Sequence, residues 1–215
     1  MSVKVEIWGD YACFSRPELK TERVTYDVIT PSAARGILEA IYWHPGLKWI
    51  IDRIYVLSPI MTTSIRRNEV QSKISANNVR TVMTGGKGAL YISTSKDIVQ
   101  RSSVVLQDVR YVIDAHFNMT DKAAESDNPG KFQDIMKRRI RKGQCFAQPY
   151  AGCREFPLNF KEWEGGEIPA IDETRDLGYM IWDLDYSDAS DIQPMFFRAK
   201  LEKGVLDLTD CEVVR

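Results

Sequence analysis

Histidine is the side chain best suited to proton transfer near neutral pH, and the chain has only two, His44 and His116. His116 lies in a segment of alternating apolar and polar residues, so we expect its side chain to point away from the core. A hydrogen-bonded structural role is the alternative to catalysis there. His44 stands beside Pro45 at the expected end of a helix, where the alternative is capping of that helix.

Tyr42 is the second kind of residue that could take part in chemistry. It lies in the last turn of the first expected helix and fits the apolar stripe of that helix, so core packing is the alternative. A partly buried tyrosine can still present its hydroxyl at a helix end and donate a hydrogen bond there.

The sequence does not favour a metal site or a cofactor. It has no Cys-x-x-Cys motif, and two histidines with scattered cysteines cannot easily form a zinc site. Buried free thiols are therefore expected at Cys13, Cys145, Cys153 and Cys211. The carboxylates of Asp172, Glu173, Asp183 and Asp185 are expected to be solvated surface groups.

A run of six residues contains five basic side chains, which are Lys137, Arg138, Arg139, Arg141 and Lys142. Such a cluster binds phosphate backbones by charge neutralisation, so RNA binding is one interpretation. The other is a solvated helix face whose cations favour the helix C-terminus. Arg66, Arg67 and Lys87 add positive charge to the middle of the chain. In a nucleotide-binding P-loop the lysine is followed by Ser or Thr, but here Gly88 follows Lys87, so nucleotide hydrolysis is excluded. A loop that lies near RNA phosphates is the alternative for this segment.

Charge is distributed unevenly along the 215 residues. The net charge is −1, but residues 1–154 hold 23 basic and 15 acidic residues, whereas residues 155–215 hold 6 and 15. The chain is therefore nearly neutral because the net charge of +8 in residues 1–154 almost cancels the net charge of −9 in residues 155–215. Such asymmetry indicates a polyanionic partner for the first segment. We expect contacts with nucleic acid to concentrate before residue 155.

Several expected elements position these residues. Val3–Ile7, Trp49–Leu57 and Val109–Met119 alternate as half-buried strands do. Thr30 and Pro31 predict the start of a helix that ends at His44. A shorter helix is expected around Phe132–Ile140, ending at Gly143, and a weak helical pattern covers Val70–Ile74. Strands dominate later, at Tyr179–Tyr186 and in a hairpin near Glu202–Gly204.

This order predicts an α+β protein. Its first part, residues 1–120, is expected to be a ferredoxin-like domain, and residues 121–215 a smaller antiparallel β-sheet domain. The N-terminus has no apolar segment typical of a signal peptide, and no stretch reaches the roughly 18 apolar residues of a membrane helix. A cytoplasmic protein is therefore expected.

Several irregular blocks resemble a known family. They are Gly9–Phe14, Tyr26–Trp43, Asp114–Phe117, Gly143–Phe146 and Pro149–Pro157. In this order they resemble the type I-C (Dvulg subtype) CRISPR-associated protein of the RAMP superfamily, which processes precursor crRNA. The similarity covers essentially the whole chain.

The resemblance implies a ferredoxin-like (RRM/RAMP) domain and an endoribonuclease that cleaves CRISPR repeat RNA without a metal or cofactor. It also implies that the protein keeps the 5′ tag bound and joins other subunits of the type I-C interference complex. The family's catalytic tyrosine and histidine correspond to Tyr42 and His116. Its catalytic lysine has no match, because Asp114 and Ala115 precede His116. A non-catalytic subunit that binds the crRNA 5′ tag is therefore the alternative.

Overall fold

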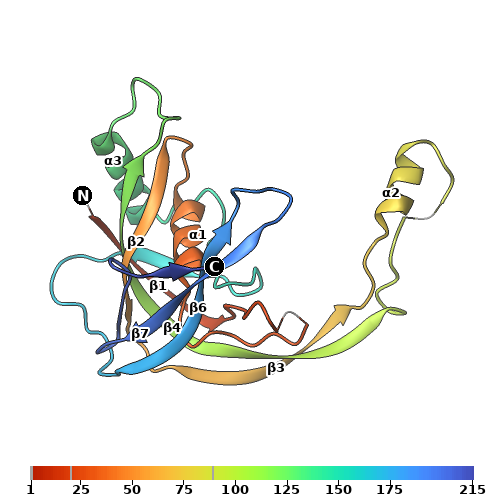
Figure 1. Cartoon of the computed structure of the whole chain (residues 1–215), viewed down its shortest axis with the longest axis horizontal. Helices are drawn as coiled ribbons and strands as arrows, with labels where there is room; N and C mark the ends of the chain where they lie inside the picture. Colours follow the sequence, from red (N-terminus) through yellow and green to blue (C-terminus); the bar gives the residue numbers. More distant parts are fainter. Residues whose placement is uncertain (1, 20, 89) are drawn as a thin grey trace. The chain divides into compact units, whose positions relative to one another are not determined.

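The computed structural model describes residues 2–19, 21–88 and 90–215. Within these ranges the chain forms strands and helices that confirm the α+β class, with antiparallel sheets (Figure 1). In chain order they are β1 (Ser2–Ala12), α1 (Pro31–Ile41), β2 (Leu47–Val56), β3 (Met61–Val70), α2 (Ala76–Met83), β4 (Ile98–Met119), α3 (Pro129–Arg141), β5 (Asn159–Glu162), β6 (Arg175–Asp185), β7 (Gln193–Leu201), β8 (Val205–Asp207) and β9 (Val213–Val214).

The larger sheet has the strand order β5-β1-β4-β2-β8, with antiparallel neighbours throughout. Residues that are paired across two strands share a face, so Val5, Ile113 and Ile54 lie on one side and are fully buried. Helices α1 and α3 cover this side, which we call the helix face. The opposite side carries Lys4 and His116 and is called the polar face.

Helix α1 begins as the sequence predicts, whereas α3 begins at Pro129, three residues before the expected start near Phe132. The Thr30 hydroxyl accepts a hydrogen bond from the Ala33 amide (3.3 Å), and Asn128 accepts one from the Lys131 amide (2.9 Å). A proline occupies the first turn of each helix, where its missing N–H costs nothing. Both helices bury their apolar stripe, which includes Ala34, Ile37, Leu38, Ile41, Phe132, Met136 and Ile140.

The second sheet has the order β6-β7-β9 and confirms the strands expected late in the chain. The predicted turn between β7 and β8 is also present. Lys203 and Gly204 adopt left-handed backbone conformations there (φ 47° and 74°), and a Cβ on Gly204 would lie 2.3 Å from the Ile171 carbonyl oxygen. Only glycine therefore fits at position 204.

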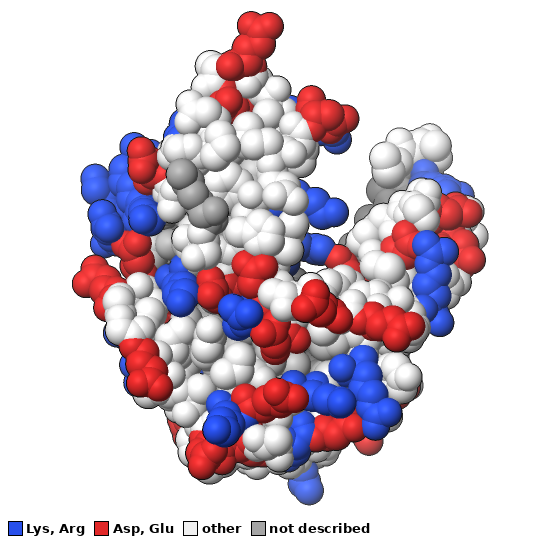
Figure 2. Space-filling model, turned by 60° about the vertical axis from the view of Figure 1, so that its left-hand side comes forward, with Lys and Arg blue, Asp and Glu red and all other residues white. Residues whose placement is uncertain are grey.

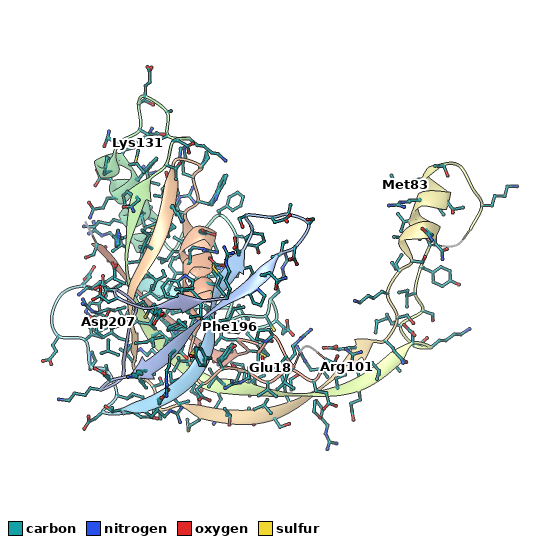
Figure 3. The ribbon with its side chains drawn as sticks, in the orientation of Figure 1. Glu18, Met83, Arg101, Lys131, Phe196 and Asp207 are labelled. Atoms are coloured by element: carbon teal, nitrogen blue, oxygen red, sulfur yellow. The ribbon has the colours of Figure 1, made fainter. Side chains whose placement is uncertain are left out.

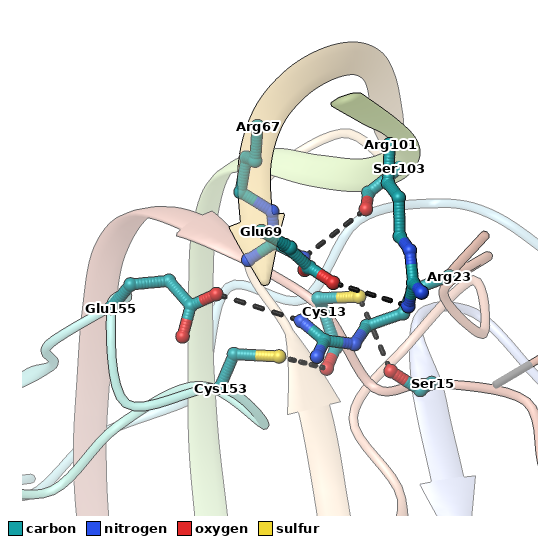
Figure 4. Close-up of polar contacts among 9 residues, drawn as sticks. All are labelled: Cys13, Ser15, Arg23, Arg67, Glu69, Arg101, Ser103, Cys153 and Glu155. Carbon is teal, nitrogen blue, oxygen red and sulfur yellow. Dashed lines mark hydrogen bonds and ion pairs between the residues drawn. The ribbon is translucent and has the colours of Figure 1, made fainter. Parts of the chain in front are cut away.

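Residues Ser64–Ser103 form a compact unit separate from the rest of the chain. This unit contains most of β3, the beginning of β4, and α2. Arg67 donates to the Ser103 hydroxyl (3.2 Å), and Arg101 pairs with Glu69 (3.4 Å), which links the two strands (Figure 4). Helix α2 buries none of its residues, and Met83 at its end is 80% exposed (Figure 3).

The helical pattern expected at Val70–Ile74 is wrong. Strand β3 continues to Val70, and the Gln71 amide donates to the Asp97 carbonyl (2.9 Å), which extends the strand pairing. The helix begins only after Ser75. Pairing with β4 therefore overrides a weak local preference.

Strands from both ends of the chain form the larger sheet. β5 and β8 follow residue 120 yet pair with β1 and β2, which precede it. The domain boundary near residue 120 stays a prediction. In the described part of the chain, no helix is long and apolar enough to cross a membrane.

The acidic segment after residue 155 pairs with cations from earlier in the chain. Asp207 pairs with Arg53 (2.8 Å), and Glu162 pairs with Arg141 (2.7 Å). Asp183 was expected to be solvated, but this is wrong, because its side chain is only 18% exposed and binds Arg35. Acidic and basic side chains are accordingly interspersed on the face shown in Figure 2.

Candidate active site

His116 lies near the end of β4, the central strand of the larger sheet. It is opposite Ser2 of β1 and Ile50 of β2, and its side chain points to the polar face. The next residue, Phe117, points to the helix face and packs against Phe132 of α3 (centroids 6.2 Å apart). The His116 side chain is 36% exposed, so the expectation that it points away from the core is confirmed.

Asp52 of β2 holds the imidazole of His116. Both carboxylate oxygens lie close to Nδ1, at 2.9 Å and 2.8 Å. A ring nitrogen so close to a carboxylate carries the proton, so Nδ1–H donates and Nε2 is the nitrogen left for a substrate. The arrangement fixes the ring orientation and leaves Nε2 free to reach a substrate, which is what a general acid or base requires.

A β-bulge positions the carboxylate. The pairing of β2 with β4 shifts between Ile51 and Arg53, so Asp52 is an extra residue without a strand partner. Bulges often redirect a side chain next to a functional site. The Asp52 backbone carbonyl accepts a hydrogen bond from the Leu208 amide (2.9 Å), which secures the bulge.

The sequence reading missed Asp52. A signal was present, since Asp52 is a carboxylate within the alternating strand that includes Ile50 and Ile54, on the same face as Ile50. Its partner could not be inferred, because that depends on how β2 and β4 align.

Two lysines flank His116 on the polar face. Lys4 is opposite Asp114 in register, two positions from Ser2, and its amine lies 3.6 Å from the Asp114 carboxylate. Lys48 is exposed and is opposite Asn118, two positions from Ile50. Diagonal neighbours on a sheet lie about 7–8 Å apart, within reach of a long side chain.

Asp114 lies two residues before His116, in the segment where the expected catalytic lysine has no match. It is buried, and burial raises its pKa although Lys4 opposes this effect. Among the described residues, its Oδ1 atom has no hydrogen-bond partner. Asp114 therefore cannot replace a cation, and any positive charge must come from neighbouring residues.

Tyr42 is placed on the helix face, away from His116. It caps the end of α1, its ring packs near Phe132 (centroids 6.2 Å), and the Arg139 guanidinium lies over the ring at 5.2 Å. Trp49 donates to the Tyr42 carbonyl (3.2 Å), and burial raises the pKa of the Tyr42 hydroxyl. The structure thus does not bring the two predicted catalytic residues together.

His44 stabilises the turn after α1. The Gly46 amide donates to Nδ1 (3.0 Å), and Nε2 lies 3.9 Å from the carboxylate of Asp127. Its ring also packs against Phe132 (centroids 4.9 Å). The hydrogen bond at Nδ1 and the packing against Phe132 fit a structural role in this turn.

The basic run on α3 divides into two groups. Arg139 donates to the Ile41 carbonyl (2.8 Å), and Arg141 pairs with Glu162, so both have structural partners. Within the described residues, Lys137, Arg138 and Lys142 form no ion pair, and the last two are exposed. Lys131 lies at the other end of the helix and pairs with Asp127 (2.7 Å; Figure 3).

The other predicted RNA-binding residues belong to the separate unit of residues 64–103. Arg66 and Lys87 are exposed, whereas Arg67 is partly buried and pairs with Glu69 (3.4 Å). Their role in RNA binding stays a prediction.

The four cysteines are free thiols, but the expectation that all four are buried is wrong, because only Cys13 is buried and the other three are partly exposed. The Cys13 sulfur lies 3.4 Å from the Ser15 hydroxyl, and the Cys153 thiol lies 3.9 Å from the Cys13 carbonyl (Figure 4). In residues 2–19, 21–88 and 90–215, no group of three or more His, Cys, Asp or Glu side chains is arranged to hold a metal ion.

Solved structures share this fold. A functionally uncharacterized protein from Streptococcus mutans, SMU1763c, has a TM-score of 0.69 at 23% identity and covers 100% of this chain and 97% of its own. The crystal structure of a CRISPR-associated protein has a TM-score of 0.69 at 22% identity, with the same coverage. At this identity the likeness establishes the fold alone.

The family follows from the sequence comparison. The family model described as CRISPR-associated protein (Cas_Cas5) matches residues 2–209, and the chain belongs to this family. A relative from Mannheimia succiniciproducens, named CRISPR pre-crRNA endoribonuclease Cas5d, is 49% identical over 96% of this chain and 94% of its own length. A protein of the same name from Thermus thermophilus is 36% identical over 96% of this chain and 90% of its length. The resemblance seen in the sequence is confirmed.

Proposed function

We propose that this protein is an endoribonuclease that cleaves CRISPR repeat RNA in precursor transcripts without a metal ion. The product's 5′ tag then stays bound, and the protein serves as a subunit of the type I-C interference complex. The names of both relatives support the activity. The observation that carries the proposal is the contact between Asp52 and His116, at 2.8 Å on an accessible sheet face.

The reaction is a transesterification within the RNA. The 2′-hydroxyl attacks the adjacent phosphate, the bond to the 5′-oxygen breaks, and a 2′,3′-cyclic phosphate and a 5′-hydroxyl result. His116 Nε2 exchanges a proton with one of these two oxygens, while Asp52 stabilises the imidazolium that forms or reacts. Lys4 and Lys48 are two cations of this face that can stabilise the charge developing on the phosphate.

A direct test of this chemistry is to remove the attacking 2′-hydroxyl from the RNA substrate. Cognate repeat RNA with a 2′-deoxy sugar at the scissile nucleotide should bind with unchanged affinity and remain uncut. Cleavage of the 2′-deoxy RNA would show that another nucleophile is used.

The proposed fold of residues 1–120 is ferredoxin-like, and residues 121–215 are proposed to be a second, β-rich domain. The order β5-β1-β4-β2, with α1 after β1 and α3 after β4, supports the ferredoxin-like arrangement, although β5 lies beyond residue 120. Sheets of this type bind RNA across one face, as the polar face around His116 would.

The second candidate function is that of a non-catalytic subunit that binds the crRNA 5′ tag. The buried Asp114 near His116, in a segment without a lysine, favours it. This candidate predicts tight, salt-sensitive binding of tagged RNA and no cleavage of the repeat.

The role of Tyr42 is testable through its hydroxyl. Because the sheet separates Tyr42 from His116, Tyr42→Phe should lower the cleavage rate by about tenfold or less, whereas general acid–base catalysis contributes about 10²–10⁴-fold. Single-turnover cleavage of repeat RNA measures the rates of Tyr42→Phe and His116→Ala. A loss with Tyr42→Phe as large as that with His116→Ala would indicate that bound RNA brings both groups into one active centre.

The exposed basic side chains at the end of α3, Arg138 and the following Lys142, should contact RNA phosphates. The double variant Arg138→Ala, Lys142→Ala should bind repeat RNA more weakly, and the slope of log K against log[salt] should fall by about 1 per lost contact. The matched control is Lys200→Ala, Lys203→Ala, which removes two exposed cations of the acidic segment. An unchanged slope in the α3 variant would support the solvated-face interpretation.

A further inference from the structure

We propose that the pocket beside α1 binds an unpaired nucleobase of the RNA, stacked on Trp43 or Phe146. This inference rests on the proposed RNA substrate and adds a second contact site to it. The pocket has a volume of about 720 Å³, within the range of about 300–1,000 Å³ typical of small-molecule sites. It lies entirely within the unit formed by residues up to 63 and from 104 onwards.

Large aromatic side chains around this pocket are unusually exposed. Trp43 is 56% exposed, Phe146 is 78% exposed and Tyr150 is 39% exposed. Solvent-exposed aromatic groups that gather at one site mark a binding surface. Stacking on such rings is the common way in which proteins hold unpaired bases, because every base has an aromatic face.

The pocket walls are held in place before a ligand arrives. The amides of Phe146 and Ala147 both donate to the Ala40 carbonyl, at 2.8 Å and 3.0 Å, which fixes this loop to the end of α1. On the other side, Arg35 binds Asp183 and ties α1 to β6. A preformed site avoids the entropy cost of ordering its side chains on binding.

Polar groups of the pocket match a nucleotide. The Glu39 carboxylate and the Ser32 hydroxyl can accept hydrogen bonds from base amino and imino groups. Arg154 is exposed on the pocket wall and can pair with a phosphate. Glu39 also pairs with Arg35 (3.4 Å), and a pocket that contains both this carboxylate and Arg154 suits a base joined to a phosphate better than a bare phosphate ion.

A short stretch of chain connects the basic part of α3 to the pocket. Helix α3 ends at Arg141, and the next residues, 142–146, lead directly from the exposed Lys142 to Phe146. Arg139 joins the same end of α3 to the Ile41 carbonyl, two residues before Trp43. The exposed cations Arg138 and Lys142 are thus close in sequence to the aromatic ring of Phe146, and this positive charge favours RNA over a protein partner.

The experiment uses an unpaired oligoribonucleotide of about ten residues with one 4-thiouridine, bound to the full chain. Trp43→Ala and Phe146→Ala should each weaken binding by about 5- to 160-fold, from a stacking contribution of about 1–3 kcal/mol per base. Trp43→Phe should retain most of the affinity. The matched control is Tyr179→Ala, because Tyr179 is 61% exposed and lies outside the pocket. Photocrosslinks should map to Trp43 or to residues 143–150.

Unchanged affinity in Trp43→Ala and in Phe146→Ala, with crosslinks elsewhere, would overturn the proposal. A protein partner would then be the better explanation for the exposed aromatic side chains. Because this assay measures binding, it is independent of cleavage. Wild-type protein that cuts repeat RNA but shows no pocket crosslinks would reject only the pocket. Pocket crosslinks without any cleavage would support the pocket and reject the nuclease.

Discussion

Replacing His116 with alanine is expected to lower the rate of repeat cleavage by about 10²–10⁴-fold, the usual contribution of a general acid or base. RNA affinity should change little, because the lost group acts in the chemical step. The fold should also persist, since His116 is 36% exposed and its partner Asp52 keeps 21% of its side chain in solvent. Single-turnover cleavage and filter binding with the same RNA measure the two effects.

Asn118→Ala is the matched control for this experiment. Asn118 is on the same strand, two positions along, so it shares the polar face with His116 and is exposed. Its removal should leave the cleavage rate within about threefold of wild type, far below the contribution of a proton-transfer group. Equal losses in the two variants would indicate a general disturbance of the strand rather than a missing proton-transfer group.

Asp52→Asn should lower the cleavage rate by about 10²-fold. Asparagine has nearly the shape of aspartate, but it cannot stabilise an imidazolium and does not enforce the Nδ1–H tautomer. The single-turnover rate at saturating enzyme should fall while the half-saturating concentration stays constant, because Asp52 acts through His116 rather than on the RNA. Asp176→Asn removes a carboxylate that pairs with Arg198 (2.6 Å) in the second sheet, and it should leave the rate unchanged.

A double-variant cycle distinguishes positioning from a purely structural role. In the His116→Ala background, Asp52→Asn should cause no further loss of rate, since the group it orients is already absent. A full additional 10²-fold loss would contradict the proposed pairing. Guanidinium unfolding of each variant controls for stability.

The sequence predicts the local features of this site well. The start of α1 depends on a capping side chain and a proline that are adjacent in sequence, Thr30 and Pro31, so it is recognised without the fold. The same pair of signals at Asn128 and Pro129 marks the start of α3, although the apolar pattern predicts that helix only from Phe132. The alternation of Val109–Met119 likewise places His116 on the polar face, because side-chain direction in a strand has a period of two. Each of these features is determined by neighbours in sequence.

Features that depend on distant contacts could not be predicted. Asp52 meets His116 only through the pairing of β2 with β4 and the bulge within it. The separation of Tyr42 from His116 arises because α1 covers one face of the sheet, and no local pattern says which face. The sequence predicts a solvent-exposed Asp183 because its partner, Arg35, lies 148 residues away and their contact cannot be inferred from local patterns.

The central claim is metal-independent cleavage by the His116 and Asp52 pair. The most direct measurement mixes purified protein with end-labelled cognate repeat RNA in excess chelator and identifies the product ends. We predict cleavage at one site, with a 2′,3′-cyclic phosphate on the upstream product, and its loss in His116→Ala. Tight binding with no cleavage, or cleavage that needs an added divalent metal or survives His116→Ala, would contradict the account.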